Sequence, residues 1–250
     1  LPKSLELAER ALAIDETISE AHSFIGFLHS FFERDPVRGE RSLRRAVELG
    51  QNIAVNHSNM AALFIFRGQL EEAMEAAEAT QRLDPLSPTN NAWACWWIGL
   101  AGRHEQSIAQ LENMISLDPN HWLPHHVLGD LYPRLERIED GITESRNAVD
   151  LSGGNSICLA QLSYLSTLGG SAEEAEKSFQ TLRDRARESY VPPTFFAWIH
   201  QARHDWDEAV RCIEEAAHIN DPWVATYSST KGILPSNPRV DEAVKRFSLS

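Results

Sequence analysis

The sequence has few cysteines, no long apolar run and no recognisable secretory leader. Its three cysteines, Cys95, Cys158 and Cys212, are odd in number and far apart in the chain. They favour reduced thiols in a cytoplasmic protein over a disulfide framework. No apolar run approaches the roughly 20 residues that a membrane helix needs, so we expect no membrane partner.

Positive charge is also in deficit. The 250 residues carry 23 Lys and Arg against 36 Asp and Glu, which gives a formal net charge of −13. Such a chain repels phosphate backbones and anionic lipid surfaces, so nucleic acids are not expected partners. The hydrophobic share of 42% is ordinary for a protein with a buried core. The chain opens on Leu1 inside a helical pattern, and we expect it to be a fragment of a longer protein.

Enzyme signatures are absent as well. There is no G-x-S-x-G, no Gly-rich phosphate loop and no H-E-x-x-H. The glycine pairs in 151–156 and 168–174 fall where helices should end, so they indicate turns. The sequence therefore predicts no catalytic residue, no cofactor and no metal, and hence no enzyme.

What the chain does have is one pattern that returns about every 34 residues. Its anchor positions, mostly small or apolar, lie at intervals of 35 and then 34 five times. They are Ala11, Ala46, Thr80, Met114, Ala148, Leu182 and Ala216. Small or apolar residues also stand three and seven positions before most anchors, which is one face of an amphipathic helix. Pro85, Pro119 and Pro222 follow their anchors closely, and proline ends a helix.

A second, more apolar helix precedes each of these, and short turns such as 67–69 and 102–104 join the two. This plan resembles the tetratricopeptide repeat (TPR), whose first helix carries W-x2-L-G-x2-Y. The segments "HSFIGFLH", "HSNMAALF" and "HHVLGDLY" fill those positions, with the small slot at Gly26, Ala61 and Gly129. The small residue is needed because two helices cross there at close range. The resemblance implies an all-α fold, a right-handed α-solenoid of stacked helix-turn-helix repeats with a C-terminal cap.

The predicted array covers residues 1–222 and begins with a half repeat at 1–18. Full repeats follow at 19–53, 54–87, 88–121, 122–155, 156–189 and 190–222. The repeat at 156–189 is the most degenerate, since Ser163 and Ser166 replace the small and aromatic residues and Arg187 stands in the place of proline.

The last segment, 223–250, does not restart the period and is predicted to cap the array. Its stretch "PRVDEAVKRF" predicts a short helix with Val240, Ala243, Val244 and Phe247 facing inward. The C-terminal run resembles the end of TPR regions in bacterial multidomain regulatory proteins.

Histidines cluster at His121, His125 and His126, which raises the question of a metal site. Pro124 interrupts this stretch, and His125 shares its slot with His22 and His57 of other repeats. A metal site does not predict histidine in one slot of three separate repeats, whereas a packing role does.

The first helices of stacked repeats line a concave face, which is where such proteins hold partners. One inward row is rich in aromatic residues, and flanking rows add polar ones. We predict a peptide-binding groove formed by Phe27, Asn59, Trp93, Trp96, His126, Asp130, Arg134, Tyr164 and Trp198. For Phe31 and Phe66 packing between helices is the preferred interpretation. For Trp96 and Trp198 packing and binding both stay open, because tryptophan is rarely fully buried and is frequent at binding hot spots.

These patterns favour a non-enzymatic scaffold that binds an apolar or aromatic-bearing peptide or helix of a partner protein. One TPR subclass grips a chaperone carboxylate with lysine, arginine and asparagine. The corresponding rows here offer Asn59 and Arg134 but no lysine, which argues against that partner. Two alternatives remain: a regulatory TPR region of a larger signalling or transcription-regulating protein that acts by self-association as a homodimer, and an enzyme with an unrecognised site.

Overall fold

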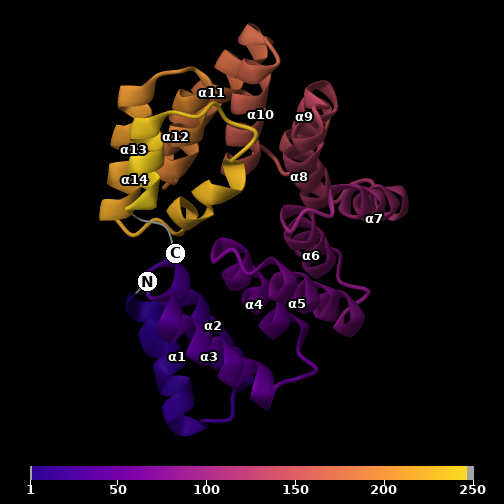
Figure 1. Cartoon of the computed structure of the whole chain (residues 1–250), viewed down its shortest axis with the longest axis vertical. Coiled ribbons are helices and arrows are strands. Elements are labelled where there is room, and N and C mark those ends of the chain that lie inside the picture. The colour runs from indigo at the N-terminus through magenta and orange to yellow at the C-terminus, as the bar shows by residue number, and fades with distance from the viewer. Residues whose placement is uncertain (1, 247–250) are drawn as a thin grey trace. The chain divides into compact units, whose positions relative to one another are not determined.

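A computed structural model describes residues 2–246 of the chain, and every regular element in this range is a helix. The prediction of an all-α repeat fold is confirmed. The helices form two compact units that divide after Arg103, as the colour change in Figure 1 lets the reader follow. None of the helices in 2–246 has the length and apolar character needed to cross a membrane. Phe247, predicted to face inward in the cap, lies outside the described residues.

Between residues 2 and 103 the first unit holds six helices. They are α1 (Pro2–Ile14), α2 (Ser19–Phe31), α3 (Pro36–Leu49), α4 (Ala54–Phe66), α5 (Leu70–Leu83) and α6 (Pro88–Leu100). Helices α2 and α3 pack as one hairpin and α4 and α5 as the next, while α6 lies against both α4 and α5. The apolar first helices α2, α4 and α6 are thus neighbours in space.

The second unit repeats this plan. Its helices are α7 (His104–Leu117), α8 (Trp122–Leu131), α9 (Ile138–Leu151), α10 (Ser156–Leu168), α11 (Ala172–Glu188), α12 (Pro193–Ala202), α13 (Trp206–His218) and α14 (Pro238–Lys245). Two 3-10 helices, η1 (Tyr132–Leu135) and η2 (Pro222–Thr230), interrupt the series. The pairs α8–α9, α10–α11 and α12–α13 form hairpins, and α14 lies beside α13, as Figure 1 shows.

The six helices that follow the apolar first helices, α3, α5, α7, α9, α11 and α13, keep the period that the sequence predicts. These helices begin at residues 36, 70, 104, 138, 172 and 206, which are 34 apart each time. The exception to a regular length is α11, which has 17 residues where the others have 13 or 14. Neither proline nor glycine stands where the other helices of this set end, and α11 continues to Glu188, so that α12 begins only at Pro193. The division into repeats remains an expectation, and the break between the two units falls inside the predicted repeat 88–121.

A left-handed residue sits in the turn before each of these six helices, again 34 residues apart. The six are Arg34, Gly68, Gly102, Glu136, Gly170 and His204, with φ between 54° and 97°. The tight reversal requires this backbone conformation, which glycine adopts at little cost and other residues adopt at some cost. The turns predicted at 67–69 and 102–104 are confirmed.

The two helices of a hairpin touch where the sequence places its small residues. A Cβ added to Gly26 would lie 2.7 Å from Leu43 Cγ and 2.9 Å from the carbonyl oxygen of Gly39. A Cβ added to Gly129 would lie 2.5 Å from Ser145 Oγ. Both distances are shorter than van der Waals contact, so the backbones approach as closely as glycine alone allows.

The recurring histidines of the first helices share one contact. In each case Nε2 bonds the carbonyl oxygen six residues earlier, in the turn that enters the helix. The pairs are His22 with Glu16 at 3.0 Å, His57 with Gln51 at 2.9 Å, and His125 with Pro119 at 3.3 Å. The histidine slot therefore helps to fix the turn that enters the first helix, because its side chain satisfies a carbonyl oxygen of that turn.

Helix α14 closes the second unit. Its residues Val240 and Ala243 are buried and Val244 is half-buried, as the amphipathic pattern predicts. Hydrogen bonds also join the tail to α12: Gln201 Nε2 donates to the carbonyl oxygen of Pro235 at 2.7 Å, and Tyr227 Oη donates to Gln201 Oε1 at 2.6 Å.

The close crossing at Gly26 gives a first prediction. Gly26→Ala should lower the free energy of unfolding by about 1–3 kcal/mol, because the backbone of Gly39 cannot withdraw as a flexible side chain would. Urea unfolding followed by circular dichroism measures it. Arg41→Ala, at an exposed position of α3, is the control and should leave stability within about 0.5 kcal/mol. An unchanged midpoint for Gly26→Ala would contradict the close crossing.

Candidate interaction surface

The predicted groove residues of the first unit lie on its three first helices. Phe27 is on α2, Asn59 on α4, and Trp93 and Trp96 on α6. Asn59 Nδ2 donates to Ser23 Oγ at 3.0 Å, so this amide joins α4 to α2. Phe27, Asn59 and Trp93 are half-buried, whereas Trp96 is only 7% exposed.

Aromatic rings connect the same three helices beneath this surface. Phe31 meets Phe66 edge to face at 5.8 Å, and Phe66 meets Trp97 in the same way at 5.8 Å. Trp93 stacks on Trp97 at 5.9 Å and lies 5.4 Å from Trp96. Phe31 and Phe66 are buried, as expected for packing residues. The sequence reasoning did not single out Trp97, which is the ring that joins this ladder to the tryptophans of α6.

In the second unit the structure brings four predicted residues together on α8, η1 and α10. Arg134 Nη2 donates to Asp130 Oδ2 at 3.0 Å, across the spacing of four residues that the sequence indicates. His126 Nδ1 lies 2.9 Å from Gln161 Oε1, and Gln161 Nε2 donates to the backbone oxygen of His126. Tyr164 is buried and interacts electrostatically with both Asp130 and Arg134.

Burial governs the electrostatics of this polar cluster. His126 is deeply buried, and burial lowers the pKa of its imidazole against the opposing effects of Asp130 and the Gln161 bond. The ring is therefore neutral near pH 7. Burial also raises the pKa of the Tyr164 hydroxyl, so that group keeps its proton. The ion pair of Asp130 and Arg134 is the charged part, and its two side chains are only 9% and 12% exposed.

The last predicted residue, Trp198 on α12, stands at the centre of an aromatic cluster. Its ring lies 5.1 Å from Phe195, 6.4 Å from Tyr164, 6.5 Å from Trp223 and 6.5 Å from Tyr227. Trp198 itself is 6% exposed, while Trp223 is half-buried. The sequence reasoning missed Trp223 as a surface residue because it falls in the non-periodic segment, where no register assigns it to a face.

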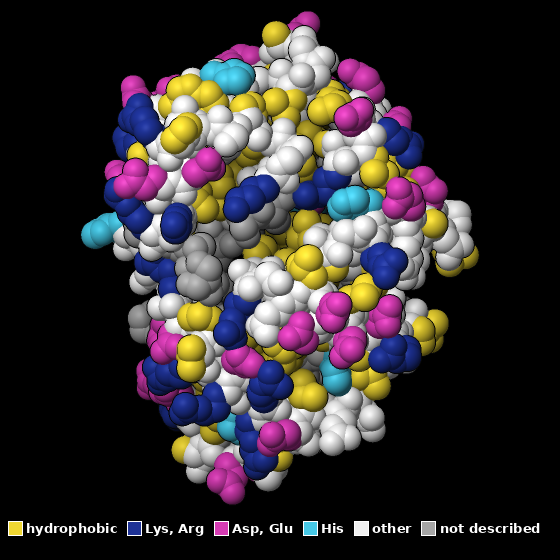
Figure 2. Space-filling view, viewed as in Figure 1, with side chains coloured by type: hydrophobic (Ala, Val, Ile, Leu, Met, Phe, Trp, Pro, Cys, Tyr) yellow, Lys and Arg dark blue, Asp and Glu magenta, His cyan; other side chains and the backbone are white. Residues whose placement is uncertain are grey.

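The burial of the nine predicted residues divides them into two groups. Those that keep a larger share of their surface exposed are Phe27, Asn59, Trp93 and Arg134, and those that are almost entirely covered are Trp96, His126, Asp130, Tyr164 and Trp198. The covered side chains hold the first helices together and leave little area for a partner. On the face drawn in Figure 2, apolar side chains are interspersed with charges of both signs.

The three thiols are buried, and no disulfide joins them. Burial raises the pKa of Cys95 and of Cys158 to about 12 and that of Cys212 to about 11. A thiol that keeps its proton is a poor nucleophile. None of the three therefore has the character of a catalytic cysteine.

Known structures provide an independent comparison with this arrangement. Pseudomonas aeruginosa PilF matches with a TM-score of 0.55 and 14% identity over 93% of this chain and 98% of its own. The Cut9 and Hcn1 hetero-tetramer of the APC/C matches with a TM-score of 0.60 and 14% identity over 97% of this chain and 51% of that chain. Human IFIT1 matches with a TM-score of 0.67 and 15% identity over 98% of this chain and 58% of its own.

The chain has the fold of a TPR-type helical repeat protein. At these identities the likeness of the TPR fold carries no information on a partner. No family model matches the sequence, and no curated protein does. The chain spans only about half to three fifths of the APC/C and IFIT1 chains that it matches.

The neutral, buried imidazole of His126 predicts a pH effect on stability. Its folded-state pKa is lowered below the unfolded value of about 6.5, so the unfolded state takes up a proton first as the pH falls. Stability is full above about pH 6.5 and falls below it, by at most about 1.4 kcal/mol per pH unit for one proton. Urea unfolding between about pH 7.5 and pH 5 measures the slope.

His126→Gln should flatten part of that slope, because the glutamine amide can still donate to Gln161 but cannot ionise. His218→Gln, at the exposed end of α13, is the matched control and should keep the slope of the original chain. Equal slopes for all three proteins would show that His126 does not take up the proton.

Proposed function

We propose that the chain is a non-enzymatic interaction module that binds an apolar or aromatic-bearing peptide or helix of a partner protein. The observation that carries this proposal is the set of connected aromatic rings across α2, α4 and α6, of which Phe27 and Trp93 keep part of their surface exposed. Aromatic side chains with this partial exposure are the commonest anchors of protein interfaces.

Rigidity supports the same proposal. Trp93 is held by Trp96 and Trp97, and Asn59 by Ser23, so a partner would meet side chains that already have one conformation. Little ordering entropy is then lost on binding. In the first unit the covered ring of Trp96 serves as support and Phe27 and Trp93 serve as contacts. In the second unit, taken by itself, Tyr164 and Trp198 serve as support and the half-buried Trp223 serves as a contact.

Charge indicates what kind of segment would bind. Arg134 is already paired with Asp130, and the amide of Asn59 is already used, so neither is available to grip a peptide carboxylate as a charged clamp would. The net charge of −13 disfavours nucleic acid as a ligand. We therefore propose an apolar segment as the ligand of this surface, in a cytoplasmic setting.

The proposal is tested at Trp93. Trp93→Ala should weaken binding of a partner isolated with the original chain by about 2 kcal/mol or more, about 30-fold in Kd, because an anchor ring is lost. Isothermal titration calorimetry with that partner measures the change. Trp93→Phe keeps a ring at the site and should recover most of the affinity.

Leu86→Ala is the matched surface control, since Leu86 is a large apolar residue that is 90% exposed and lies outside the ring ladder. It should bind like the original chain. Melting curves of all variants separate lost contacts from lost folding. If Trp93→Ala binds with unchanged affinity while still folded, the surface on α6 is not the binding site.

Self-association is the second candidate, favoured by the match to IFIT1, whose structure is described as a dimer. Multi-angle light scattering over a hundredfold range of concentration, on the order of 1–100 μM, tests it. A mass that doubles with concentration would favour a homodimer. A constant monomer mass would remove this candidate and leave a heterologous partner.

A further inference from the structure

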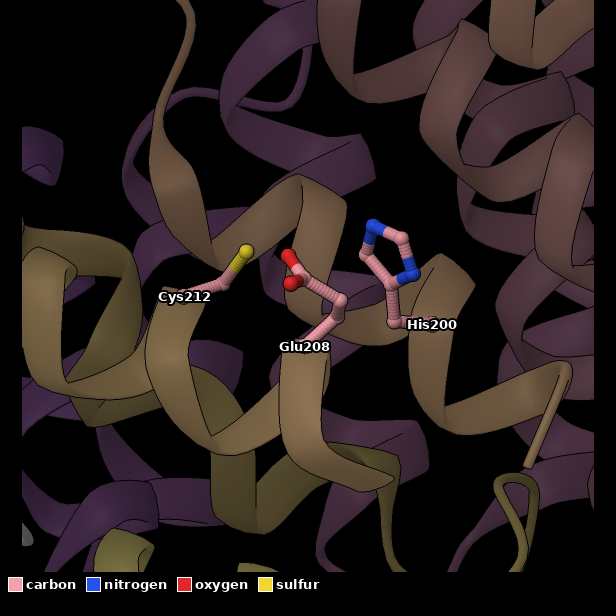
Figure 3. A group of neighbouring side chains, drawn as sticks. All are labelled: His200, Glu208 and Cys212. Atoms are coloured by element: carbon pink, nitrogen blue, oxygen red, sulfur yellow. The ribbon is translucent and has the colours of Figure 1, made fainter. Parts of the chain in front are cut away.

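Three side chains of different chemistry meet in the last hairpin of the array. His200 lies on α12, and Glu208 and Cys212 lie on α13. One ligand atom of each lies within 4.8 Å of those of the other two. Figure 3 shows the carboxyl group of Glu208 between the imidazole of His200 and the thiol of Cys212.

The hairpin geometry explains why they converge. Glu208 and Cys212 are four residues apart, which puts them on one face of α13 a single turn from each other. The short turn with left-handed His204 folds α12 back along that face and brings His200 opposite them. No sequence signature marks this set, because the histidine and the thiol are brought together by the turn between two helices rather than by spacing on one helix.

The imidazole of His200 is oriented by a carboxylate. Its Nδ1 lies 3.1 Å from Asp205 Oδ2, which as a carboxylate oxygen can only accept, so Nδ1 donates. The lone pair is then on Nε2, which leaves that atom as the ligand nitrogen. A carboxylate behind the imidazole is the usual second contact of a metal-binding histidine, and it increases the basicity of the ligand.

Access and existing contacts are compatible with a ligand. Glu208 is 42% exposed and His200 17%, whereas Cys212 is buried at the inner end. Arg211 contacts Glu208 only through Oε2, at 2.9 Å from Nε and 2.5 Å from Nη2. Oε1 can therefore turn toward a cation while the arginine stays in place.

We propose that His200, Glu208 and Cys212 bind one thiophilic divalent cation, for which Zn²⁺ is the best fit. Nitrogen, oxygen and sulfur ligands in one set are typical of zinc, and hard cations such as Mg²⁺ avoid sulfur. Metal–ligand bonds of about 2.0–2.3 Å suit ligand atoms that lie within 4.8 Å of one another, and the exposed glutamate side chain can adjust to complete the geometry. A water molecule would complete a fourth position.

Metal binding must remove the proton of the Cys212 thiol, because the thiolate is the form that binds a metal. Burial and nearby negative charge raise the pKa of Cys212 to about 11, so the free protein holds S–H at neutral pH. Binding forms the metal–sulfur bond and breaks the S–H bond, and the proton leaves to solvent with no change of oxidation state. The bound ion would join α12 to α13, and it would act independently of the interaction surface proposed above.

Cobalt titration tests the site with the full chain under reducing conditions. Co²⁺ should bind at one ion per chain and give a near-ultraviolet band from thiolate-to-cobalt charge transfer, because it takes the same ligands as zinc. Added Zn²⁺ should abolish the band. Cys212→Ser should lose it, and Cys158→Ser, which removes another buried thiol of the same unit, should keep it.

Two milder variants protect the test against unfolding of Cys212→Ser. Glu208→Gln and Asp205→Asn change exposed carboxyl groups and should each weaken Co²⁺ binding at least about tenfold, while circular dichroism stays unchanged. A titration without a charge-transfer band, or a band of equal strength in Cys212→Ser, would overturn the proposal. So would equal affinities for the original chain and Glu208→Gln.

Discussion

The structure depends on the close approach of two helices at each hairpin crossing. At Gly26 the backbone of the facing helix stands 2.9 Å from where a Cβ would be, and at Gly129 a serine hydroxyl fills the same space at 2.5 Å. Where a slightly larger residue takes the slot, as at Ala61, it is fully buried. Because each crossing sets how far apart its two helices stand, it also sets where the next hairpin can pack. That spacing therefore determines where the side chains of the first helices lie.

The aromatic rings of those first helices fulfil two requirements at once. Phe31, Phe66 and Trp97 fill the space between α2, α4 and α6, and Trp93 rests on this ladder with part of its ring exposed. Around Trp198 in the second unit the arrangement is similar, with Trp223 as the more exposed ring. The exposed rings and the covered rings are therefore layers of one packed aromatic structure.

Local sequence was sufficient to predict the helices but not the burial of their side chains. The 34-residue spacing, the small slots and the turns at Gly68 and Gly102 could all be read directly. Arg34, Glu136 and His204 take the same left-handed conformation without a glycine to mark it, so tertiary packing imposes it there. Whether Trp96 or Trp198 is covered depends on side chains of neighbouring helices, which no single helix pattern encodes. The sequence alone does not predict the group formed by His200, Glu208 and Cys212, because these residues come together only when α12 and α13 pack against each other.

The burial of the three cysteines has a practical consequence for following motion in this chain. Cys95 lies in α6, Cys158 in α10 and Cys212 in α13, so each thiol is buried in a different part of the array. A reagent that modifies thiols can reach each sulfur only when the helices around it separate, and at that moment the thiol regains its ordinary acidity. The rate of modification at each position therefore reports how often that part of the array opens. The three native cysteines can therefore serve as probes of local unfolding without any added label site.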